Sequence, residues 1–99
     1  MTFELAFCSD ALKEWKKLDN SIKSQFKSKL SERLKHPRVT SAKLSGHSNR
    51  YKIKLRSIGY RLVYEVVDKK LIVVVVAIGR REHNLTYVVA AGRQIKEAD

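Results

Sequence analysis

An unbroken run of apolar residues from Leu71 to Ile78 constrains the fold of this chain more than any other feature. Apolar residues that do not alternate with polar ones are typical of a strand that is buried on both faces. The run is far shorter than the roughly 20 residues that a helix needs to cross a bilayer. We therefore expect a central strand of a sheet, ended by Gly79, and no membrane anchor.

The residues before this run alternate between apolar and charged side chains. Segments 50–56 and 60–67 both have a period of two, which is typical of half-buried strands, and residues 57–59 supply a turn between them. The sequence therefore predicts a hairpin with Ser57 opposite Tyr60. In that register the core-facing pairs are Leu55 with Leu62, Ile53 with Tyr64, and Tyr51 with Val66.

The same register gathers positive charge on the other face of the hairpin. It places Arg56 opposite Arg61, with Lys54 and Lys52 along the same row. Like charges on adjacent strands cost about 0.2–1 kcal/mol per pair, so an anionic ligand would relieve them. Single-stranded RNA or DNA fits such a row beside tyrosines. The alternative is a solvated basic face, in which Glu65, opposite Lys52 in this register, forms a surface ion pair.

The N-terminal half shows a strand pattern followed by two helix patterns. Residues 2–7 alternate as a strand does, and residues 9–18, capped by Ser9 or Asp10, repeat apolar side chains at helical spacing. A second helix, with a cap at residues 19–21, ends near Lys35 because a proline follows closely. The C-terminal segment has weak helical character. The predicted order is β-α-α-β-β-β-α, in a single compact α+β domain (1–99) with an antiparallel-rich sheet and helices packed on one face.

Composition narrows the class of partner. The chain has 99 residues, enough for one domain, and 43% of them are hydrophobic. Its 21 lysines and arginines against 10 acidic residues give a formal charge of +11, which indicates a polyanionic partner. The single cysteine, Cys8, excludes an internal disulfide and favours a reducing compartment. Because no signal peptide is visible, we expect a cytoplasmic protein.

Motifs for a metal site, a phosphate-binding loop or an enzyme nucleophile do not occur, so we expect no metal and no cofactor. His36 and His47 have the character of exposed loop residues, whereas His83 can be either a solvated side chain or an acid or base.

A basic surface can still cut RNA when the 2′-hydroxyl attacks the neighbouring phosphate. Crowding by other cations favours the neutral form of a lysine, which draws Lys52 or Lys54 towards the role of base.

One group of segments carries a family resemblance: residues 51–64 at its centre, then residues 11–18, 43–46 and 79–82, with Tyr87 downstream. These segments resemble the RelE toxins of bacterial toxin–antitoxin systems. It covers nearly the whole chain without gaps. It implies a compact fold related to small microbial ribonucleases and an activity that cuts messenger RNA in the ribosomal A site. The products would be a 2′,3′-cyclic phosphate and a 5′-hydroxyl.

The resemblance also implies a catalytic site. Lys52 and Lys54 would orient or deprotonate the 2′-hydroxyl, and Arg61 would stabilise the transition state. Arg81 would donate a proton to the leaving oxygen, and Tyr87 would stack on or orient the scissile nucleotide. The choice of base among Lys52, Lys54 and Tyr87 stays open. The residues expected to make further contacts with RNA are Arg50, Arg56, Lys43, Arg80 and His83.

The implied partners are a ribosome with messenger RNA in its A site and a RelB-type antitoxin. The antitoxin would wrap the toxin and displace its C-terminal helix, and operator DNA would be bound only through the antitoxin. Glu65 and His83 depart from the family's catalytic set, because Glu65 can blunt Lys52 by pairing with it and His83 adds a titratable group. Two alternatives remain: a non-catalytic basic protein that blocks translation by binding RNA or the ribosome, and an inactive co-repressor.

Overall fold

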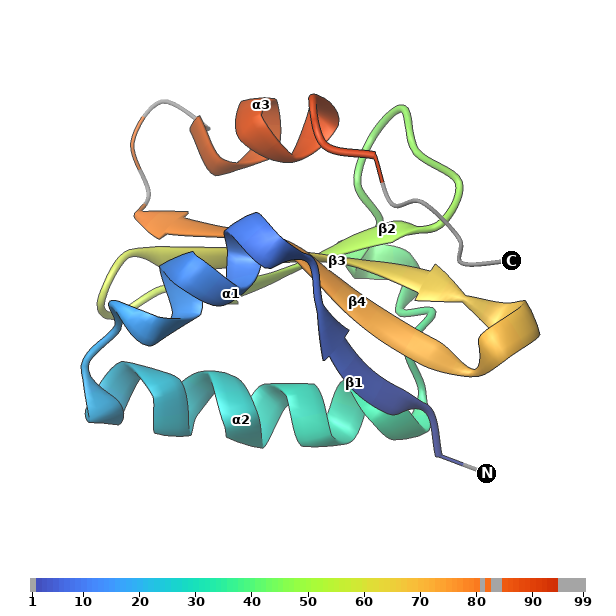
Figure 1. The fold of residues 1–99 in the computed structure, drawn as a ribbon, viewed down its shortest axis with the longest axis horizontal. Helices are drawn as coiled ribbons and strands as arrows, with labels where there is room; N and C mark the ends of the chain where they lie inside the picture. The colour runs from blue at the N-terminus through green and yellow to red at the C-terminus, as the bar shows by residue number, and fades with distance from the viewer. Residues whose placement is uncertain (1, 81, 83–84, 95–99) are drawn as a thin grey trace.

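The computed structural model describes residues 2–80, Glu82 and residues 85–94 (Figure 1). Its elements follow the predicted order, in an α+β fold that forms a single compact domain. Among the described residues, no helix is both long and apolar enough to span a bilayer. Two short 3-10 turns, Thr40–Ala42 and Asp68–Lys70, precede β2 and β4. The strands and helices are β1 (Glu4–Phe7), α1 (Ser9–Lys16), α2 (Asn20–Lys35), β2 (Arg50–Leu55), β3 (Tyr60–Val67), β4 (Ile72–Arg80) and α3 (Leu85–Ala91).

β4 is an inner strand of the sheet. The strand order is β1-β4-β3-β2, with β1 parallel to β4 and the other two pairings antiparallel. Residues 73–76 each expose at most 5% of their surface. The central strand predicted from the apolar run is therefore confirmed, although it runs through Gly79 to Arg80 and does not end at the glycine. Leu71, at the beginning of that run, lies instead in the preceding turn with a φ of 53°.

The hairpin forms, but its register differs from the prediction by two residues. Residues 56–59 make a longer turn than expected, in which Gly59 adopts a φ of 68° that glycine tolerates without strain. Because side chains alternate between faces with a period of two, a slip of two residues leaves them on their predicted faces. The observed pairs include Leu55–Tyr60, Lys54–Arg61, Ile53–Leu62 and Lys52–Val63.

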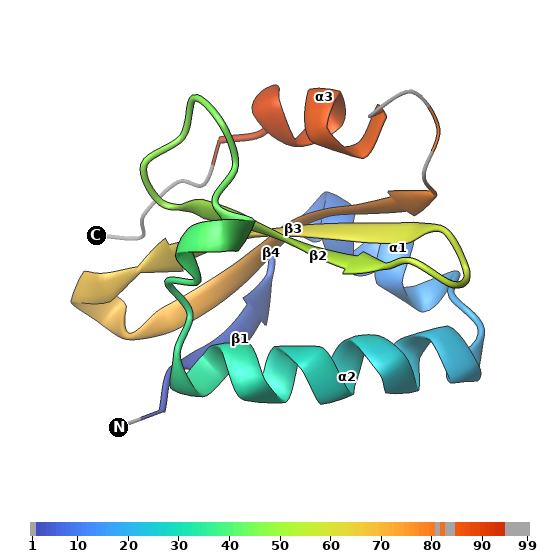
Figure 2. The ribbon, with the colours of Figure 1, turned by 180° about the vertical axis from the view of Figure 1, so that it is seen from behind.

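Helices cover both faces of the sheet (Figures 1 and 2), which corrects the prediction that they pack on one face. On one face, Ala11 of α1 and both Phe26 and Leu30 of α2 belong to the larger hydrophobic core. On the other face, Ala90 of α3 packs in a smaller cluster with Val76 of β4. The apolar run requires this second cover, because a strand that is apolar on both faces would otherwise expose one of them to water.

Both N-terminal helices have the predicted positions. The N-cap of α1 is Cys8 and not the predicted Ser9 or Asp10, whereas that of α2 is Asp19, within the predicted residues 19–21. Neither residue makes a side-chain capping hydrogen bond. The end of α2 at Lys35 is confirmed. Pro37 accounts for it, since the residue before a proline avoids helical geometry.

Side chains close the edge of β4 beyond the end of β1. The Ile78 N–H donates to Oε1 of Glu14 on α1 at 3.1 Å. Arg93, which follows α3, donates to the carbonyl oxygen of Val76 at 2.8 Å and to both oxygens of Glu14 at 2.9 and 3.1 Å. These bonds satisfy backbone groups of an otherwise open edge, and they tie the segment after α3 to α1.

Candidate functional site

The cationic residues of the hairpin lie on the face of the sheet that α3 covers. The ring centroid of Tyr87 on α3 is 5.8 Å from Lys52 Nζ and 5.1 Å from Arg61 Cζ. Lys54 pairs with Arg61 across the hairpin, and both line a hollow of about 190 Å³ near the turn. The structure thus brings Lys52, Lys54, Arg61 and Tyr87 together. The fifth predicted catalytic residue, Arg81, lies outside the described residues, as does His83.

Three of the residues predicted to contact RNA are exposed around this cluster. Arg56 lines the same hollow as Lys54. Arg80 lies over the ring of Tyr60, with its Nε 3.2 Å from the phenol oxygen. Lys43 lies at the outer edge of β2. All three positions are open to a ligand, and their contacts with RNA stay predictions.

Arg50 has an internal role, so the structure gives no support to its predicted contact with RNA, which stays a prediction. It is 5% exposed, and its Nε donates to Oε1 of Glu65 at 2.9 Å. Its other nitrogens donate to the carbonyl oxygens of Ala90 and Arg93, at the end of α3. Glu65 therefore pairs with Arg50 and not with Lys52, as the observed register requires. The ion pair through which Glu65 was expected to weaken Lys52 is therefore not formed in this structure.

Burial raises the pKa of the Tyr87 hydroxyl above the ordinary tyrosine value, and the nearby Arg61 guanidinium only partly offsets that rise. The phenol therefore keeps its proton throughout the neutral range. In this position Tyr87 offers an aromatic ring and a protonated hydroxyl to a ligand. A phenol that keeps its proton is a weak base at neutral pH, and the choice of base among Lys52, Lys54 and Tyr87 stays a prediction.

Arg33 of α2 is a functional candidate that the sequence patterns did not single out. Its Nη1 donates to the Tyr64 hydroxyl at 2.8 Å and to the carbonyl oxygen of Lys52 at 3.2 Å. The Tyr64 hydroxyl in turn donates to the carbonyl oxygen of Pro37 at 2.6 Å. Arg33 thus supports the strand that carries Lys52. The one available signal was its place in the acid-free stretch between Glu32 and Glu65.

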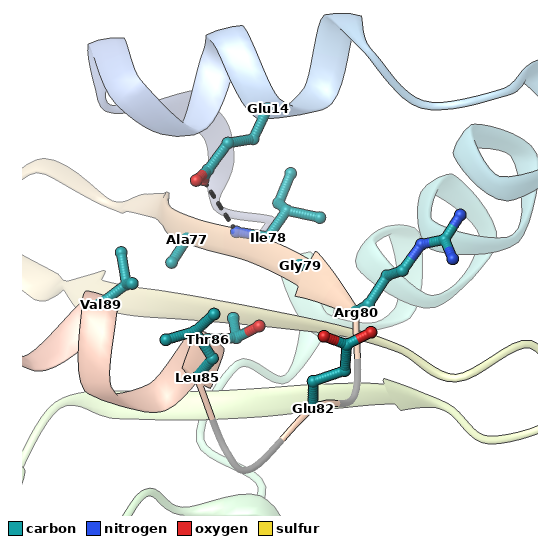
Figure 3. A pocket seen from close by; sticks show the side chains of 9 residues that line it. All are labelled: Glu14, Ala77, Ile78, Gly79, Arg80, Glu82, Leu85, Thr86 and Val89. Carbon is teal, nitrogen blue, oxygen red and sulfur yellow. Dashed lines mark hydrogen bonds between the residues drawn. The ribbon is translucent and has the colours of Figure 1, made fainter.

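A pocket of different chemistry lies between α1, the end of β4 and α3 (Figure 3). Its volume is about 160 Å³. Leu85, Val89 and Ile78 give it apolar walls, and the carboxyl groups of Glu14 and Glu82 lie at its margin. Arg80 also lines this pocket, but its walls are apolar and its carboxylates repel phosphate, so we do not count it as part of the cationic cluster.

α3 is seated on β4 through a contact that requires glycine. Thr86 is 5% exposed, and its Oγ1 would lie only 2.6 Å from a Cβ atom added to Gly79. A contact that short forces one of the two groups to move. The glycine therefore sets how closely α3 approaches the sheet, and with it the position of Tyr87 on the same helix.

Gly79→Ala is expected to push Thr86 and α3 away from the sheet and to lower the free energy of unfolding by about 1–3 kcal/mol, as overpacking does. Adding Thr86→Ala removes the colliding oxygen and should recover most of that loss. Chemical denaturation of the single and double variants measures both effects. A double variant no more stable than Gly79→Ala alone would contradict this account of how α3 is seated.

Comparison with known proteins gives consistent matches over nearly the whole chain. Residues 5–85 match the family model of the ParE toxin of the type II toxin–antitoxin system parDE. The mRNA interferase toxin RelE of Escherichia coli K12 is 48% identical over 93 residues, which make up 94% of this chain and 98% of that protein. A free-state double mutant of E. coli toxin RelE matches with a TM-score of 0.87 and 46% identity, over 96% of this chain and 100% of that one. The E. coli RelBE toxin–antitoxin complex contains a chain that matches with a TM-score of 0.78 and 49% identity, over 82% and 99%.

Proposed function

The chain belongs to the RelE/ParE family of toxins of type II toxin–antitoxin systems, and on this basis we propose that it is an endoribonuclease that cuts messenger RNA in the ribosomal A site. One observation carries the proposal beyond family membership. Lys52, Lys54 and Arg61 lie together on one face of the hairpin, with Tyr87 beside them. Such a cluster suits a scissile phosphate, because negative charge on phosphorus grows in the transition state.

The chemistry that fits this cluster is attack by the RNA's own 2′-hydroxyl. The 2′ oxygen bonds to the adjacent phosphorus while the bond from phosphorus to the 5′ oxygen breaks. A base takes the 2′ proton, and an acid supplies a proton to the leaving oxygen. The products carry a 2′,3′-cyclic phosphate and a 5′-hydroxyl. No bond or proton transfer in this scheme requires a metal ion. We therefore propose a metal-independent enzyme.

The proposed roles come from the resemblance to RelE toxins, and the positions of Lys52, Lys54, Arg61 and Tyr87 are compatible with them. Lys52 or Lys54 takes the 2′ proton, and Arg61 stabilises the extra charge on phosphorus. Tyr87 presents its ring to the scissile nucleotide. Arg81 keeps its proposed role as the proton donor to the leaving oxygen. Positioning of the message by the ribosome supplies the alignment of the 2′-hydroxyl with the phosphate.

Tyr87→Ala is expected to slow cleavage by about 10-fold or more, because base stacking on an aromatic ring is worth roughly 1–3 kcal/mol. Tyr87→Phe keeps the ring and should retain most of the rate. Because burial raises the pKa of the Tyr87 hydroxyl, wild-type and Tyr87→Phe proteins should share the same rate profile across the neutral pH range. Single-turnover rates across pH test this. If Tyr87→Phe is as slow as Tyr87→Ala, and if its pH–rate profile lacks an inflection that the wild-type profile shows, then the Tyr87 hydroxyl itself acts in the reaction. That result would favour Tyr87 as the base.

Mapping of RNA ends tests the proposed function itself. Primer extension on a message incubated with the protein should show cuts inside codons when ribosomes translate that message. The same message without ribosomes should stay largely intact. Cuts that appear equally without ribosomes would contradict the A-site proposal. Inhibited translation without any new RNA ends would favour the alternative, a basic protein that blocks the ribosome by occupying it.

We further propose a RelB-type antitoxin as the partner of this chain. A similar structure is the RelBE toxin–antitoxin complex. α3 leaves Leu85 57% and Val88 65% exposed, so a partner chain that displaces or covers this helix would bury apolar surface. Operator DNA would be contacted through the antitoxin.

Expression of the chain alone should arrest bacterial growth, and normal growth would favour the inactive co-repressor. The two proposed partners, the ribosome and the antitoxin, place the proposed activity in the cytoplasm.

A further inference from the structure

The outer edge of β2 carries a second cationic hollow, distinct from the one beside Arg61. β2 is the last strand of the sheet, and α2 and the turn at residues 40–42 lie beside it (Figure 2). The hollow has a volume of about 290 Å³. Cations dominate its lining, which comprises Arg33, Ser41, Ala42, Lys52, Lys54 and Arg56. We call it the edge groove.

Arg33 is held in place within the edge groove and still has donors to offer. Its Nη1 makes both of its described hydrogen bonds, to the Tyr64 hydroxyl and to the carbonyl oxygen of Lys52. Its guanidinium carbon lies 5.7 Å from the centre of the Tyr64 ring. A guanidinium has five N–H groups, so among the described contacts three remain for a ligand. An arginine fixed in this way loses little further entropy when it binds a phosphate.

The edge groove adjoins the hollow of the candidate site and shares two lining residues with it. Lys54 and Arg56 line both of them. Among the described residues that line the two hollows, none is acidic. A row of cations without an intervening carboxylate is the usual track for a nucleic-acid backbone. A strand whose scissile phosphate lies near Arg61 can therefore pass over Lys54 and Arg56 to reach Arg33.

We propose that the edge groove is a second phosphate subsite, in which Arg33, Ser41 and Arg56 hold an RNA phosphodiester beyond the one that is cut. The proposal rests on the proposed function and extends it from a single phosphate to a path for RNA around the edge of the sheet. The phosphodiester comes either from the same message or from the ribosome's own RNA, and the two sources are separated below.

The first test measures binding of a single-stranded 2′-O-methyl RNA, which cannot be cut because its 2′ oxygen carries no proton. A short oligonucleotide that fills only the hollow beside Arg61 is compared with a longer one by fluorescence anisotropy at several salt concentrations. For the longer RNA, Arg33→Gln and Arg56→Gln should each reduce the slope of log K against log salt by about 0.7, the value for one lost phosphate contact on a single strand.

Lys13→Gln is the matched control. It removes the same charge from an exposed position on α1, which packs against β4 and not against β2. Equal slopes for the Arg33, Arg56 and control variants would overturn the subsite. A change in Arg33→Gln alone would also overturn it, because Arg33 would then act through its bond to Lys52. Arg56 is exposed in the turn, so Arg56→Gln should fold even if Arg33→Gln is unstable. Because Arg56 also lines the hollow beside Arg61, its variant supports the subsite only if the slope falls with the longer RNA and not with the shorter one. An equal fall with both RNAs would overturn the subsite.

Ribosomes identify the source of the phosphate. Binding is measured to ribosomes whose message ends in the P site and to ribosomes whose 2′-O-methyl message continues through the A site. Weaker binding of Arg56→Gln only with the longer message assigns the groove to messenger RNA, and weaker binding with both assigns it to ribosomal RNA. If wild-type protein cuts translated messages but the groove variants match Lys13→Gln, the subsite alone fails. If wild-type protein makes no cuts, the proposed function fails independently of the salt slopes.

Discussion

Arg50→Met is expected to lower the free energy of unfolding by about 3 kcal/mol, the lower end of the range for removing one partner of a buried ion pair. The substitution leaves the Glu65 carboxylate, only 22% exposed, without its guanidinium partner. It also removes the donors to the carbonyl oxygens of Ala90 and Arg93, which hold the end of α3. Chemical denaturation, with the midpoint and slope fitted separately, measures the loss.

The double variant Arg50→Met with Glu65→Gln provides the control for this prediction. It removes the stranded charge, so it should recover part of the stability that Arg50→Met loses. A loss below about 0.5 kcal/mol for Arg50→Met, typical of a surface substitution, would show that Arg50 is solvated and would reopen its predicted contact with RNA.

Arg61→Gln is expected to slow cleavage of ribosome-bound message by about 100- to 1,000-fold, the usual cost of losing one group that stabilises transition-state charge. Glutamine keeps a polar side chain of similar length but removes the positive charge opposite Lys54 and beside Tyr87. Single-turnover cleavage on programmed ribosomes measures the rate, and thermal unfolding confirms that the variant is folded.

Binding to the ribosome separates this prediction from the occupancy alternative. If Arg61 acts mainly on the transition state, Arg61→Gln should bind ribosomes with nearly unchanged affinity while cutting slowly. Lys13→Gln, which loses the same charge far from the site, should cut at the wild-type rate. A rate for Arg61→Gln within about twofold of that control would remove Arg61 from the proposed site.

Local patterns predicted most of the fold because they report burial directly. The apolar run before Gly79 marked β4 as an inner strand, and the alternation on either side of the turn gave the correct face to Lys52, Lys54 and Arg61. The register was wrong by two residues because turn length depends on the backbone of residues 56–59, which side-chain alternation does not report. The error did not change which side chains face outward, because a slip of two residues equals the two-residue period of side chains along a strand.

The features that sequence reasoning missed depend on contacts between distant segments. α3 covers the face opposite α1 and α2, although the apolar character of both faces of β4 already required such a cover. Arg50 was grouped with the other cations by charge, and only its contact with the end of α3 shows that it is internal. Arg33, in the last turn of α2, becomes notable only where α2 meets β2.

The most direct test of the account is cleavage of a programmed ribosome whose message carries a single 2′-deoxynucleotide at the position that the wild-type protein cuts. The account predicts that cutting stops at that position, because the attacking oxygen is missing. It also predicts that the unmodified message yields a 2′,3′-cyclic phosphate and a 5′-hydroxyl. Continued cutting at the deoxynucleotide would contradict the account, since the cationic face would then be serving a different nucleophile.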